Sequence, residues 1–137
     1  MWKLAVLGLA VVISQSALAL ESKDGNGDCN NLSISQQVFE CSRDRVEAAD
    51  AELNRVYKGL IRKIHVDYSS NIRMGEELEG RLRASQRAWL VSRDANCLLE
   101  VFFVEKEKIA FEVTRNNCVY RESSQRIEYL KIFNDGL

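Results

Sequence analysis

The side chains best suited to chemistry lie on two faces that helical spacing would create. Asp50, Asn54 and Tyr57 are spaced i, i+4 and i+7, so one helical face would carry a carboxylate, an amide and a phenol. Gln86 and Arg93, seven residues apart, would share a second face. Such groups can form an interhelical hydrogen-bond network or line the rim of a binding groove. We favour the network, because buried polar groups usually satisfy one another.

The second face also contains Trp89, Leu90 and Cys97, and Arg87 and Asp94 extend its polar character. We expect Trp89 in the core rather than at a contact surface, although tryptophan is common in binding interfaces. The complete predicted network comprises Asp50, Asn54, Tyr57, Gln86, Arg87, Trp89, Arg93 and Asp94.

Catalytic chemistry finds little support in the sequence. His65 is the only histidine, so a serine nucleophile would have to recruit this one distant base. No C-x-x-C pair occurs, which argues against a zinc site and a redox centre. The chain has 20 Asp and Glu residues, so many pairs of carboxylates are expected by chance, and such a pair does not by itself indicate a glycosidase. We therefore expect no catalytic residues, no metal site, no cofactor and no enzymatic activity.

The first nineteen residues are typical of a cleaved secretory signal. Lys3 supplies a basic start, residues 4–13 are almost entirely apolar, and residues 17–19 form an A-x-A cleavage site. The apolar run is short for a membrane span, and no cysteine follows the cleavage site to carry a lipid. We expect a periplasmic or secreted protein without stable membrane insertion. Its single domain would cover residues 20–137, beginning with a flexible leader at residues 20–32.

The charge balance bears on possible partners. Removal of the signal leaves 18 basic and 20 acidic residues, a net charge of −2. This balance argues against a general nucleic-acid binder or a protein of anionic membranes, both of which need a basic surface.

Four cysteines in an exported chain predict two disulfides. Three pairings of Cys29, Cys41, Cys97 and Cys118 are open, and we prefer Cys29–Cys41 with Cys97–Cys118 because each closes a local loop. Each bridge would contribute roughly 2–4 kcal/mol, chiefly by restricting the unfolded chain.

Hydrophobic periodicity predicts an all-α fold, an antiparallel bundle of about three helices, two of them long. The first helix is expected from about residue 34 to about residue 65, with an apolar residue every seven positions at Phe39, Val46, Leu53 and Leu60. A connection at residues 66–75 would lead into a second helix from about Glu76 through Cys97.

The segment before the last helix is ambiguous. Residues 98–104 could continue the second helix or form a short strand, residues 109–114 favour a strand, and Asn116-Asn117 favours a turn. We therefore expect an irregular or extended segment near residues 98–117. The last helix is predicted over about residues 121–133.

Three groups of residues form a recognisable pattern along the chain. They are Ala49-Asp50, Leu53-Asn54, Tyr57 and Leu60, then Gln86-Arg87-Ala88-Trp89-Leu90, Arg93-Asp94-Ala95 and Cys97, and finally Arg126-Ile127-Glu128-Tyr129-Leu130. Together they resemble the lysozyme-inhibitor LprI-like domain family. The four-cysteine layout fits as well, and the resemblance covers roughly residues 29–133. Members are small exported bacterial helical proteins, and at least one branch is linked to inhibiting lysozyme.

The resemblance implies an exported protein that inhibits lysozyme-type muramidases by protein–protein contact. The alternative is an envelope protein with another partner and no effect on lysozyme. Many lysozymes are strongly basic, so acidic clusters are the expected contacts. They are Glu76, Glu77, Glu79, Glu100, Glu105 and Glu107. Between Cys97 and Cys118 the family commonly has a polar, glycine-containing stretch, whereas this chain is rich in Phe, Val and Ile and has no glycine there. If this segment contacts the partner in the family, the difference leaves the identity of this chain's partner open.

Overall fold

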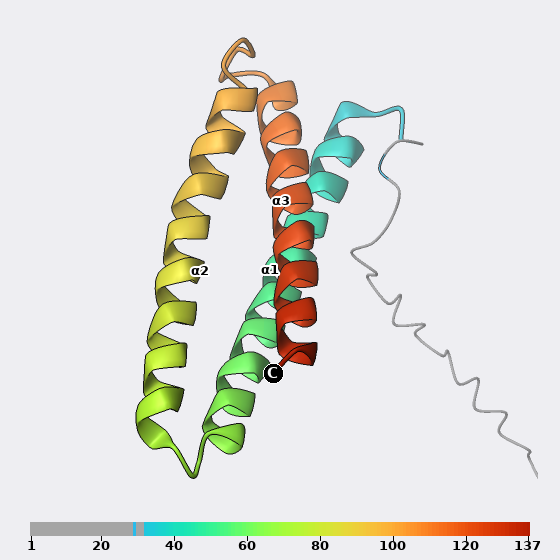
Figure 1. Cartoon of the computed structure of the whole chain (residues 1–137). Helices are drawn as coiled ribbons and strands as arrows, with labels where there is room; N and C mark the ends of the chain where they lie inside the picture. The colour runs from blue at the N-terminus through green and yellow to red at the C-terminus, as the bar shows by residue number, and fades with distance from the viewer. Residues whose placement is uncertain (1–28, 30–31) are drawn as a thin grey trace, which may run out of the picture.

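The computed structural model describes residue 29 and residues 32–137. The expected signal peptide at residues 1–19 and most of the expected leader at residues 20–32 lie outside the described residues. The described chain forms three helices, α1 (Ser35–Asp67), α2 (Ile72–Glu100) and α3 (Ile109–Asp135). Figure 1 shows an antiparallel bundle in which a tight turn joins α1 to α2 at one end and a longer connection joins α2 to α3 at the other. The predicted all-α bundle is confirmed.

The principal core lies where the apolar stripe of α1 meets the other two helices. Its buried members are Leu53, Leu60 and Ile64 of α1, Leu82 of α2, and Ile127 and Leu130 of α3. The seven-residue repeat predicted this stripe, because residues seven apart return to the same side of a helix after two turns. A smaller buried cluster surrounds Cys97 and Cys118 near the other end of the bundle.

Helix α2 is the least embedded of the three. Helix α3 packs extensively against α1, whereas α2 makes fewer contacts with either neighbour. Only Gly75, Leu82 and Cys97 of α2 are fully buried, because much of its surface carries long charged side chains. The resulting loose α1–α2 contact leaves room for a groove between these helices.

The turn between α1 and α2 is shorter than the connection predicted at residues 66–75. Helix α1 continues to Asp67 and α2 already begins at Ile72, four residues before the predicted start. The side-chain oxygen of Asn71 accepts a hydrogen bond from the Met74 backbone N–H at 3.4 Å, which caps α2. Gly75 allows the two helices to approach closely, since a Cβ there would lie 3.0 Å from the Tyr68 Cβ.

The strand predicted at residues 109–114 and the turn predicted at Asn116-Asn117 are wrong. Both segments belong to α3, which begins at Ile109 rather than near residue 121. Tertiary contacts outweigh the local preferences here. The Asn116 amide donates to Ser42 Oγ on α1 at 3.2 Å, and Cys118 is tied to Cys97.

The segment from residue 98 to residue 108 forms no strand. Helix α2 continues to Glu100, and residues 101–108 make a series of turns. The expected irregular segment is therefore present, but it is shorter than residues 98–117.

Both preferred disulfides are confirmed. The Cα atoms of Cys29 and Cys41 lie 5.9 Å apart, and those of Cys97 and Cys118 lie 5.5 Å apart. The first bridge fastens the described N-terminal residue to α1, and the second joins the end of α2 to α3.

Candidate functional site

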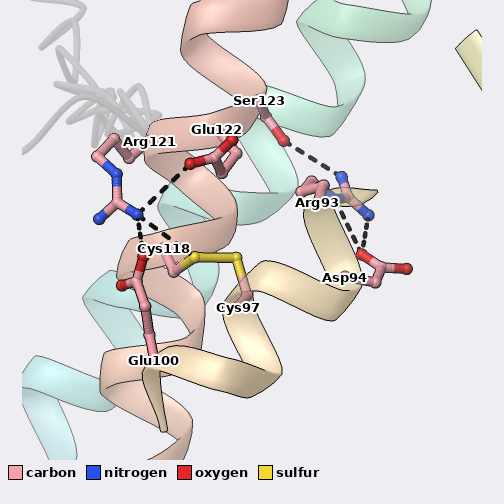
Figure 2. The surroundings of a disulfide bond; sticks show 8 residues. All are labelled: Arg93, Asp94, Cys97, Glu100, Cys118, Arg121, Glu122 and Ser123. Atoms are coloured by element: carbon pink, nitrogen blue, oxygen red, sulfur yellow. Dashed lines mark hydrogen bonds and ion pairs between the residues drawn. A yellow bond between two sulfur atoms is a disulfide. The ribbon is translucent and has the colours of Figure 1, made fainter. Parts of the chain in front are cut away.

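Arg93 connects all three helices. Its side chain is only 11% exposed, and Nη1 donates to Asp50 Oδ1 on α1 and to Ser123 Oγ on α3, both at 3.2 Å. On its own helix, Nε and Nη2 each lie 2.9 Å from Asp94 Oδ1. Figure 2 shows the guanidinium between Asp94 and Ser123. A guanidinium has five N–H donors in one plane, which suits it to join several acceptors at once.

A second buried guanidinium, that of Arg126 on α3, is hydrogen-bonded to α2. Its Nε donates to Gln86 Oε1 and its Nη2 to Ser85 Oγ, both at 2.9 Å. The guanidinium also lies over the rings of Trp89 and Tyr129, at 5.6 and 5.0 Å from their centroids. Burial lowers the pKa of Arg126 from its ordinary value. Among the described residues no carboxylate forms an ion pair with it.

Sequence reasoning missed Arg126 as a member of the network. The signal was available, since Arg126 is three residues after Ser123 and four before Leu130, on the inward stripe of α3. An arginine on such a stripe must find hydrogen-bond partners inside the bundle. Trp89 is partly buried and packs against the principal core, and the Arg93 guanidinium lies 5.3 Å from the centroid of its ring.

A groove of about 450 Å³ lies between α1 and α2. We call this the α1–α2 groove, and its lining residues are Asp50, Leu53, Asn54, Tyr57, Arg83, Gln86, Arg87, Leu90 and Arg93. Six of the eight predicted network residues line it; Trp89 is half-buried beside the core and Asp94 is exposed next to Arg93. Arg83 was not predicted, although it is spaced i, i+4 and i+7 with Arg87 and Leu90.

The three arginines of the groove differ in their surroundings. Arg83 forms an ion pair with Glu79, one helical turn earlier on α2. Arg93 is held by Asp50 and Asp94. Arg87 is exposed and takes part in no hydrogen bond or ion pair with any part of the chain that the structure describes.

The predicted acidic contacts do not form one surface. Glu76, Glu77 and Glu79 lie in the first turns of α2, whereas Glu100 ends this helix. At 1.5 Å per residue, Glu76 and Glu100 are roughly 36 Å apart along the helix. Several of these carboxylates are also neutralised locally, as in the pairs Glu77–Arg81 and Glu79–Arg83. Hydrogen bonds from His65 and then Arg83 hold the pKa of the Glu79 carboxyl below its usual value.

The other three acidic residues, Glu100, Glu105 and Glu107, lie close in the sequence to a group of exposed apolar residues. We call residues 98–108 the tip; they comprise the last three residues of α2 and the connection to α3. The side chains of Phe102 and Phe103 are 73% and 95% exposed, and their rings meet edge to face with centroids 4.9 Å apart. Leu98 and Leu99 are exposed beside them. Apolar side chains gathered in this way are typical of an interaction site.

The backbone of the tip is anchored to the bundle by a buried residue, a disulfide and an ion pair. Val101 is buried, and its carbonyl accepts a hydrogen bond from the Val104 N–H at 2.9 Å. Behind it, the buried Cys97–Cys118 disulfide joins α2 to α3, and Arg121 of α3 forms an ion pair with Glu100 (Figure 2). Because this backbone is anchored, little of its conformational entropy remains to be lost when the phenylalanines contact a partner.

Two further properties concern the described residues alone. No three His, Cys, Asp or Glu side chains in residues 29 and 32–137 gather closely enough to hold a metal ion. None of the three described helices combines the length and apolar character needed to cross a membrane.

Comparisons with known proteins identify relatives of this chain. The sequence model of the family described as lysozyme inhibitor LprI matches residues 29–130, which include both disulfides, the α1–α2 groove and the tip. The fold is similar to the crystal structure of a DUF1311 family protein from Pseudomonas putida KT2440, with a TM-score of 0.65 and 27% sequence identity. That similarity covers 72% of this chain and 92% of the other. The comparison with curated proteins finds no significant match.

Proposed function

This chain belongs to the LprI lysozyme inhibitor family, and from that membership we propose that it inhibits lysozyme-type muramidases by direct protein–protein contact. The match over residues 29–130 is the observation that carries the proposal. We further propose that the protein acts by binding rather than by catalysis.

The tip is the surface that we assign to the contact. Binding interfaces concentrate their energy in a few aromatic anchors, which a polar rim shields from water. Phe102 and Phe103 have this character, and the exposed residues Glu100, Glu105 and Glu107 lie near them in the sequence. An apolar pair on a fixed support is well suited to enter a recess such as the substrate cleft of a glycan-cleaving enzyme.

The acidic rim is expected to contribute less than the apolar anchors. Glu100 pairs with Arg121 and Glu105 with Lys108, so the attraction to a basic lysozyme is partly cancelled within the tip. Exposed ion pairs of this kind contribute little and are screened by salt. We therefore expect inhibition to depend only modestly on ionic strength. Glu76, Glu77 and Glu79 lie at the opposite end of α2, too far away to join the same contact.

We place the protein outside the cytoplasm, as a mature domain of residues 20–137 in the periplasm or secreted. Two disulfides support this location, since such bridges persist in oxidising compartments. The apolar tip also supports an alternative, an envelope protein with another partner, because this stretch differs from the polar one common in the family.

An inhibition assay tests the proposal. The mature, oxidised protein is titrated into a basic c-type lysozyme and a g-type lysozyme, and the lysis of cell-wall substrate is followed. We expect potent inhibition of at least one enzyme. Absence of inhibition of both enzymes at high micromolar concentration would contradict the proposed function and favour the alternative partner.

A further inference from the structure

We propose that the α1–α2 groove is a second binding site, which takes the carboxylate of a small polar ligand. The site is separate from the tip, and this proposal does not depend on the inhibition of lysozyme. Arg87 lies thirteen residues before Glu100, the last residue of α2, which corresponds to roughly 20 Å along the helix axis.

The first argument is charge. The groove is lined by three guanidiniums and a single carboxylate, that of Asp50. Glu79 neutralises Arg83 from outside the lining, and Asp50 and Asp94 neutralise Arg93. With these three carboxylates counted the local charge balances, but it is unevenly placed: Arg87 is the one guanidinium of the lining without a carboxylate partner among the described residues. An unpaired guanidinium on the wall of a groove favours an anionic ligand.

The second argument is geometry. Arg83 and Arg87 are four residues apart on α2, so their side chains emerge on the same face about one helical turn apart. The planar fork of a guanidinium matches a carboxylate, to which it can donate two parallel hydrogen bonds. Arg93 is already fixed by its hydrogen bonds to Asp50 and Ser123, which makes this end of the groove rigid.

The third argument is the chemistry of the remaining wall. Asn54 and Tyr57 supply an amide and a phenol, and Gln86 a second amide, so a ligand's hydroxyl or amide groups find both donors and acceptors. Leu53 and Leu90 add an apolar patch. A volume of about 450 Å³ lies within the range of small-molecule sites. The hydrogen bonds of Arg93 to Asp50 and Ser123 account for its position in the groove. Arg87 has no such hydrogen bond or ion pair with the described residues.

Two sources could provide such a carboxylate, an acidic sugar and a peptide C-terminus. The mature, oxidised protein is titrated with N-acetylmuramic acid and with N-acetylglucosamine, which lacks the lactyl carboxylate. A parallel titration uses acetyl-Ala-Ala and its C-terminal amide. Binding is followed by the chemical shifts of backbone amides in NMR spectra. We expect at least one acid to shift resonances of the groove and its neutral analogue to leave them unchanged.

Arg87→Ala is the decisive variant, because Arg87 is exposed and its loss should not affect folding. We expect it to weaken binding of the acid roughly tenfold or more, the worth of a charge-assisted hydrogen bond. Arg73→Ala is the matched control, an exposed arginine of α2 outside the groove. Equal shifts with acid and neutral analogue, an unchanged affinity of Arg87→Ala, or no shifts with either acid at millimolar concentration would overturn the proposal.

Discussion

Replacing Arg93 by alanine should destabilise the bundle by about 2–4 kcal/mol. The hydroxyl of Ser123 is completely buried, and Arg93 Nη1 donates to it, so the substitution leaves this oxygen without that partner. An unsatisfied buried polar group costs roughly 1–3 kcal/mol. The stacking of the guanidinium over Trp89 adds roughly 0.5–1 kcal/mol. The carboxylates of Asp50 and Asp94 are 43% and 53% exposed, so water replaces the arginine there and little is added.

Urea unfolding of the oxidised protein, followed by far-UV circular dichroism, measures this change. The midpoint should fall while the slope of the transition stays constant, because the surface exposed on unfolding is unchanged. Arg87→Ala is the matched control on the same helix and should change stability by less than about 0.5 kcal/mol. Asp50→Asn should have a small effect, below about 1 kcal/mol, since the Asp50 side chain is partly hydrated. An Arg93→Ala protein as stable as the wild type would refute the buried network.

Four further predictions concern stability. Gly80→Ala should stabilise α2 by roughly 0.5–1 kcal/mol, because the position is exposed and a Cβ would meet nothing within 4 Å. Gly75→Ala should destabilise, since its Cβ would lie 3.0 Å from that of Tyr68; thermal melts that rank the two variants in the other order would contradict the packing of this turn. Replacing Cys97 and Cys118 together by alanine should lower stability by roughly 2–4 kcal/mol, measured by urea unfolding, and an unchanged midpoint would rule out a structural role for the bridge. The folded-state pKa of Glu79 is lowered, so its contribution to stability is present above its unfolded pKa and is lost as pH falls through the folded value. Glu79→Gln should therefore reduce the loss of unfolding free energy between neutral and acidic pH. A dependence of unfolding free energy on pH identical to that of the wild type would argue against the His65 and Arg83 contacts.

The sequence predicted those features that depend on spacing along a single helix. The seven-residue repeat through Leu53 and Leu60 identified the core face of α1, because helical geometry alone places these residues together. Short loops between neighbouring cysteines likewise indicated the two disulfides. The residues of the α1–α2 groove also emerged in large part from i, i+4 and i+7 spacing.

Features that depend on contacts between helices were missed. Residues 109–117 have the local preferences of a strand and a turn, yet they are helical because the Cys97–Cys118 bridge and the Asn116–Ser42 hydrogen bond hold them against the bundle. Arg126 was overlooked because its partners, Gln86 and Ser85, lie forty residues earlier on another helix. The spread of the acidic residues over both ends of α2 likewise became apparent only once the continuous helix was seen.

The proposed contact is tested most directly by the inhibition constants of tip variants against the lysozyme that the wild-type protein inhibits. Phe102→Ala/Phe103→Ala removes both aromatic anchors without touching a buried residue, and Val66→Ala/Ile132→Ala is the matched control, two similarly exposed apolar residues outside the tip. We expect the tip variant to raise the inhibition constant at least roughly thirtyfold, the effect of losing one interface hot spot, and the control to leave it unchanged. Equal inhibition by both double variants would contradict the assignment of the contact to the tip.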